Sequence, residues 1–75
     1  MNQALEAVRL VQDALYQAVV EAGSHGIPAG YLYTAVSMNG VSLRAFEALM
    51  FGLVKDHKVY VRHNCYFAHN SSLHS

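Results

Sequence analysis

The spacing of hydrophobic residues changes once along this chain, close to Asp56. Before Asp56, apolar residues recur at intervals of three and four, which is the spacing of one face of an α-helix. After it, β-branched and aromatic residues gather in two short runs, Val59-Tyr60-Val61 and Cys65-Tyr66-Phe67, as is typical of β-strands. The pattern predicts an α+β fold that is mostly helical, with three helices followed by a C-terminal β-hairpin.

The first helix is predicted to follow a cap at Asn2 and to end at Ala22, because its pattern is unbroken until Gly23-Ser24-His25-Gly26. The residues expected to face the core are Leu5, Val8, Val11, Leu15, Val19 and Ala22. The apolar side of this helix is wider than packing against a single core requires. Its edge must therefore be covered by the rest of the domain or by a second chain. We predict a homodimer with an interface at Ala7, Leu10, Ala14 and Ala18, the Ala7–Ala18 stripe.

Two further helices are predicted between Ile27 and Lys55. Ile27 and Pro28 are expected to form one short extended pair that leads into a helix, because proline disfavours helix in the residue before it and suits the first helical turn. Asn39-Gly40 ends this helix, and Ser42 caps the next one. So short a connection makes a pair of the helix-turn-helix kind. The core face of the third helix is expected to comprise Leu43, Phe46, Leu49, Met50, Leu53 and Val54.

The last predicted element is the hairpin, with a tight turn at Arg62-His63-Asn64 in which Asn64 can adopt a positive φ. Residues 1–69 are expected to form one domain, because 75 residues cannot enclose two independent cores. Residues 70–75 are polar and lack periodicity, so they are predicted to form a tail.

The order of these elements resembles the winged helix-turn-helix domain across residues 3–68. The features that carry the resemblance are Gly26-Ile27-Pro28, the turn Ser37-Met38-Asn39-Gly40-Val41-Ser42, the apolar series Phe46, Leu49, Leu53 and Val54, and the two strand runs that would form the wing. The resemblance implies that the third helix enters the DNA major groove and that the wing tip reaches phosphates or the minor groove. The sequence departs from the family in two ways: Asp56-His57 stands where the family commonly has glycine or asparagine after this helix, and the face expected to read DNA is unusually apolar.

The third helix carries one row of residues opposite its core face, namely Arg44, Ala48, Phe51 and Lys55, which we call the Arg44–Lys55 stripe. For DNA, Arg44 could contact a guanine or a phosphate, Ala48 and Phe51 thymine methyls, and Lys55 the backbone. The hairpin would add Lys58, Arg62, His63 and Asn64. The same stripe suits a protein partner, because it lacks Asn, Gln, Ser and Thr and places Phe51 between two cations.

The placement of charge slightly favours nucleic acid over a protein partner. Five Lys and Arg residues balance five Asp and Glu residues, which excludes a strong uniform field for nucleic acid or an acidic membrane. The acids prevail by two charges in residues 1–23 and the cations by two from residue 24 onward. We therefore predict a small DNA-binding protein, either a transcriptional regulator or an accessory factor. The alternative is a protein-interaction module, either a complex subunit or a phage-type inhibitor, that does not bind DNA.

Catalysis, metals and cofactors are not expected. Cys65 is the single cysteine, so it can form no internal disulfide, and with His63 it supplies only two candidate metal ligands. No paired carboxylates, nucleophilic triad or phosphate-binding glycine loop accompanies them. No apolar run approaches the ~20 residues of a membrane span, and no basic segment precedes one, so we expect a cytoplasmic protein.

Overall fold

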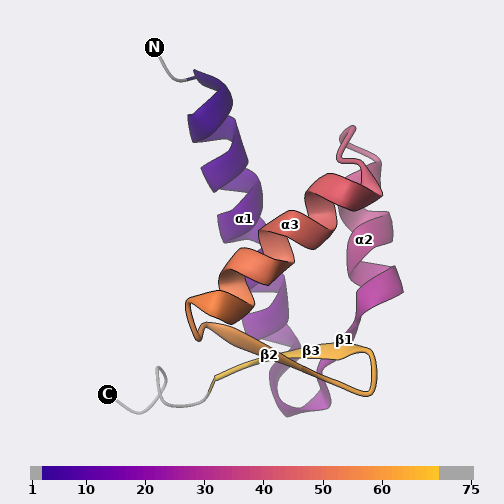
Figure 1. Ribbon diagram of the computed structural model, residues 1–75. Coiled ribbons are helices and arrows are strands. Elements are labelled where there is room, and N and C mark those ends of the chain that lie inside the picture. The colour runs from indigo at the N-terminus through magenta and orange to yellow at the C-terminus, as the bar shows by residue number, and fades with distance from the viewer. Residues whose placement is uncertain (1–2, 70–75) are drawn as a thin grey trace.

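The computed structural model describes residues 3–69, with side chains from residue 6 onward, so the predicted cap at Asn2 and the predicted tail at residues 70–75 lie outside it. Its elements, in chain order, are α1 (Gln3–Ala22), the short 3₁₀ turn η1 (Gly23–His25), β1 (Ile27–Pro28), α2 (Ala29–Ser37), α3 (Leu43–Lys55), β2 (Val59–Arg62) and β3 (Cys65–Ala68) (Figure 1). The fold is α+β and mostly helical, as the spacing predicted, and its layout is compatible with a winged helix.

The three strands form one antiparallel sheet in the order β1-β3-β2. The hairpin turn consists of His63 and Asn64 with φ values of 53° and 65°, which makes it a two-residue turn of the primed type, and Arg62 belongs to β2. The Ala29 N–H donates to the Asn64 carbonyl oxygen at 3.0 Å. The tip of the hairpin is therefore attached to the start of α2.

Both ends of α3 are capped. At its start the Ser42 hydroxyl accepts a hydrogen bond from the Ala45 N–H at 3.1 Å, as expected of an N-cap. At its end His57 has a φ of 62°, and the N–H groups of His57 and Lys58 donate to the carbonyls of Val54 and Leu53. This is a Schellman motif in which histidine occupies the position that favours glycine.

The core lies where α1, α2 and α3 meet the sheet. Its buried residues are Leu15, Val19, Leu32, Phe46, Met50, Leu53 and Val59. Two residues predicted to face this core do not, because Val8 and Leu43 are 46% and 51% exposed. Val8 belongs to the first turns of α1 and Leu43 is the first residue of α3, and both of these helix ends lie away from the sheet (Figure 1).

None of the helices described between Gln3 and Lys55 combines the length and the apolar character needed to cross a lipid bilayer.

Candidate functional site

The Arg44–Lys55 stripe is exposed along the whole of α3. All four of its residues are solvent-exposed, and the Phe51 side chain retains 67% of its accessible surface. Phe46 and Met50 are buried on the opposite face of the helix. The structure therefore presents one outward row in which an arginine and a lysine flank an alanine and a phenylalanine.

Contacts from neighbouring elements fix the rotation of α3. The Gln12 amide of α1 donates to the Leu49 carbonyl oxygen at 3.1 Å, and the same nitrogen would lie 3.0 Å from a Cβ at Gly52. The Phe46 ring lies 5.4 Å from the Tyr33 ring and 6.5 Å, edge to face, from the Tyr66 ring. These contacts turn the stripe away from the core.

The hairpin residues do not gather beside the stripe. Arg62, His63 and Asn64 are exposed at the tip, which lies beside β1 and the start of α2, whereas Lys55 ends α3 near the base of the hairpin (Figure 1). Lys58 lies against α1 instead, with its ammonium group 5.6 Å from the centre of the Tyr16 ring. The structure thus offers two separate basic positions, one on α3 and one at the hairpin tip.

The cations of these two positions are available to a partner. Among the described side chains, Arg44, Lys55 and Arg62 form no ion pair or side-chain hydrogen bond. Elsewhere in the fold, the pKa of Tyr66 is raised by burial and, to a smaller extent, by the negative charge of Glu47.

Within residues 3–69, no three His, Cys, Asp or Glu side chains converge in a way that could hold a metal ion. Cys65 is half-buried on β3, where its register partner on β2 is Arg62.

The Ala7–Ala18 stripe divides into two parts. Ala7, Leu10 and Ala14 are exposed, with Leu10 retaining 67% of its surface, whereas Ala18 packs against the core. The exposed part covers the first turns of α1 and is free for contact with another chain.

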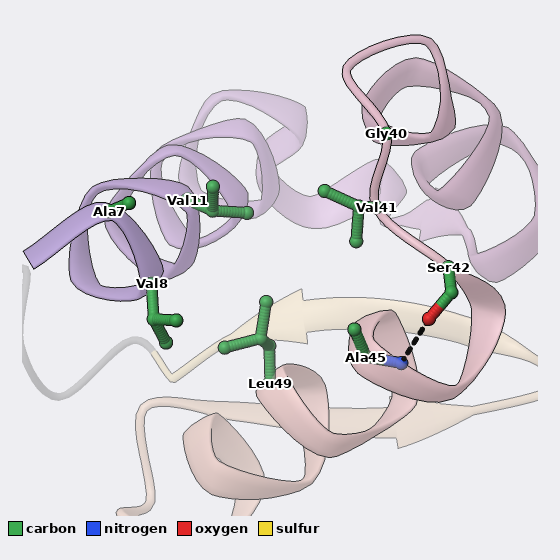
Figure 2. A pocket seen from close by; sticks show the side chains of 8 residues that line it. All are labelled: Ala7, Val8, Val11, Gly40, Val41, Ser42, Ala45 and Leu49. Atoms are coloured by element: carbon green, nitrogen blue, oxygen red, sulfur yellow. Dashed lines mark hydrogen bonds between the residues drawn. The ribbon is translucent and has the colours of Figure 1, made fainter. Parts of the chain in front are cut away.

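Sequence reasoning missed an apolar groove at the same end of the molecule. Figure 2 shows it between the first turns of α1 and the connection from α2 to α3, with Val8 directed toward Leu49 and Val11 toward Val41. Its volume is ≈ 260 Å³, and it is lined by Ala7, Val8, Val11, Gly40, Val41, Ser42, Ala45 and Leu49. Helical spacing assigned Val8 to the core, and the spacing alone gave no sign that α3 and its connection stop short of covering it.

Comparison with known proteins adds no relative: no protein-family model matches the chain, and no curated protein or solved structure is significantly similar to it.

Proposed function

We propose that this chain binds duplex DNA, with α3 placed against the major groove and the hairpin tip against the backbone. The observation that carries the proposal is the exposure of the Arg44–Lys55 stripe on a helix whose other face is buried. Its two cations stand at opposite ends of α3, about 16 Å apart along the axis at 1.5 Å per residue. Arg62 supplies a third cation at the hairpin tip.

The charge distribution supports weak, salt-sensitive binding. Each phosphate contact contributes about 0.9 to the slope of log affinity against log salt, so three cations correspond to a slope of roughly three at most. The chain has no net charge to add long-range attraction. A homodimer, which we also propose, would present two stripes to one duplex and double the number of contacts.

Phe51 favours a second candidate, a protein partner on the same stripe. An aromatic side chain that is 67% exposed between two cations is typical of an anchor in a protein interface. On this alternative the chain is an interaction module, and affinity depends on Phe51 rather than on the charges.

Fluorescence anisotropy with mixed-sequence duplex DNA at two salt concentrations tests the proposal. Arg44→Ala and Lys55→Ala should each lower the affinity and reduce the salt slope by about one unit. Arg9→Ala is the matched control, because Arg9 is an exposed arginine on α1 outside the stripe. Circular dichroism verifies that each variant is folded.

The outcome separates the two candidates. If the wild type binds no duplex even at low salt, the DNA proposal is wrong, because every protein that contacts the backbone shows nonspecific affinity there. Equal effects of Arg9→Ala and Arg44→Ala would also contradict it. If a protein partner is the ligand, Phe51→Ala should weaken its binding by about 2 kcal/mol or more, with little influence of salt.

A further inference from the structure

The first half of α1 extends past the body of the domain. Twenty residues of α-helix span about 30 Å, but the buried residues of α1, Leu15 and Val19, lie in its second half. Every residue from Glu6 to Leu10 is exposed. Val8 lies on the same face as Leu15 and Val19, two and three turns earlier, so the core-facing side of the helix continues where the domain no longer covers it.

Exposed apolar side chains are concentrated at this end. Seven large hydrophobic side chains are exposed in the described structure, and four of them, Val8, Leu10, Met38 and Leu43, lie in the first turns of α1 or between the end of α2 and the start of α3. Met38 retains 82% of its surface. These two segments border the apolar groove on both sides (Figure 2).

The lining of the groove limits what can occupy it. Ligand pockets for small molecules usually measure about 300–1,000 Å³ and carry several polar groups that orient the ligand. This groove is smaller, and its one polar side chain, Ser42, already accepts the hydrogen bond from the Ala45 N–H. No cation lines it, so it is not suited to nucleic acid. An apolar protein segment is the occupant that remains.

We propose that the groove is filled by the first turns of α1 from a second copy of this chain. One wall of the groove is α1 itself, so a two-fold axis brings the same apolar edge, Ala7, Val8 and Val11, onto the partner's groove, and each copy gives and receives the same contact. The first turns of α1 carry one acid and one cation, Glu6 and Arg9, so pairing them in two copies brings no net charge together at the contact. The two α1 helices would lie antiparallel.

Such a pair must bury enough surface on each copy. A stable dimer buries on the order of 800 Å² on each partner, roughly a seventh of the 5506 Å² surface of this domain. The groove supplies the centre of the contact, and the exposed side chains of Met38 and Leu43 beside it supply its margin. The proposal rests on the homodimer proposed above and moves its interface from the Ala7–Ala18 stripe to the groove.

Light scattering over low to high micromolar concentrations, without DNA, tests this interface. Val8→Glu should raise the dimer dissociation constant about tenfold or more, because an unpaired carboxylate would be placed in an apolar contact. Ala45→Arg should act in the same way from the opposite wall, and this exposed alanine can be enlarged without disturbing the core. Leu10→Glu is the matched control, since Leu10 is exposed on α1 but does not line the groove.

Each outcome decides the question. Loss of the dimer in Val8→Glu and Ala45→Arg, with Leu10→Glu still dimeric, supports the groove, and Ala45→Arg alone decides if Val8→Glu does not fold. Loss in Leu10→Glu but not in the two groove variants assigns the interface to the Ala7–Ala18 stripe and overturns the proposal. A strictly monomeric wild type also overturns it, whereas the DNA proposal is judged separately from the anisotropy of the same sample.

Discussion

The two halves of α1 have the same apolar spacing but very different surroundings. The second half belongs to the packed end of the molecule, where Leu15 and Val19 are buried against the sheet and the other helices and Tyr16 lies beneath Lys58. The first half belongs to the open end, where no residue from Glu6 to Leu10 is buried and Val8 borders a groove. An amphipathic pattern therefore shows that a face needs covering and does not show what covers it.

The boundary between the two ends lies at the crossing of α1 and α3. There the Gln12 side chain donates to the Leu49 carbonyl oxygen and packs against Gly52. The glycine leaves room for it, because it has no side chain. On the sheet side of this crossing the apolar surface is used for folding. On the other side the first turns of α1 leave Val8 and Leu10 exposed and available for binding.

The largest expected difference concerns truncation of α1 side chains at the two ends. Leu15→Ala should lower the free energy of unfolding by about 2–5 kcal/mol, because it leaves a cavity in the core. Val8→Ala should cost less than about 1 kcal/mol, because roughly half of that side chain is already in water. Urea denaturation, repeated at two protein concentrations to separate folding from association, measures both. Similar losses for the two variants would remove the distinction between the ends.

Alanine in place of two glycines gives a second comparison. Gly26 at the packed end has a φ of 75° and a ψ of 170°, a conformation that is essentially restricted to glycine, and Gly40 at the open end has a φ of 85°, so Gly26→Ala and Gly40→Ala should each carry a backbone cost of about 1–3 kcal/mol. A Cβ at Gly26 would also lie 2.5 Å from the Phe67 ring, which stacks on Tyr60, whereas nothing lies within 4 Å at Gly40. Gly26→Ala should therefore cost a further 1–3 kcal/mol or so.

Thermal and urea unfolding of the two alanine variants measure the difference. The control is Phe67→Leu, which should cost less in the Gly26→Ala background than in the wild type because it relieves the clash. Equal free energies of unfolding for Gly26→Ala and Gly40→Ala would show that the Phe67 side chain can move aside at little energetic cost.

The C-terminus of α3 offers a stabilising change. His57 has a φ of 62° in the Schellman motif, a conformation that costs about 1 kcal/mol or more for a residue with a Cβ and nothing for glycine. His57→Gly should therefore raise the free energy of unfolding by about 1 kcal/mol, less the extra freedom that glycine gives the unfolded chain. Asp56→Gly, one residue earlier and without a positive φ, should destabilise and serves as the control.

Much of the fold was predictable because its signals are local. The Ser42 cap, the tight turn at Asn64 and the extent of α1 to Ala22 follow from residue chemistry at single positions, and the structure confirms them. The positive φ of His57 was not predicted, because histidine adopts such a conformation far less often than glycine does. His57 has this positive φ because the chain must turn sharply there for β2 to begin directly after α3.

The candidate site was predictable only in part. Exposure of the Arg44–Lys55 stripe follows from helical geometry, and the structure bears it out. The position of Lys58 over Tyr16 depends on how α1 packs beside the start of β2, which a linear pattern does not contain. The groove likewise results from the angle between α1 and α3. Burial of Val8 and Leu43 was wrongly predicted for the same reason: both follow the helical period beyond the point where a neighbour is present.

The smallest expected effect is a change of stability in alkali, and it also belongs to the packed end. Burial, and then the charge of Glu47, raise the pKa of Tyr66 above its ordinary value, so the folded protein keeps that proton more firmly than the unfolded chain. The resulting stabilisation is complete below the unfolded value of about 10 and is lost as the pH rises through the folded value. Tyr66→Phe should make the fall in unfolding free energy above pH ~10 shallower, and Glu47→Gln should do so to a smaller extent. Urea denaturation across this range measures both, and identical alkaline profiles for wild type and Tyr66→Phe would contradict the assignment.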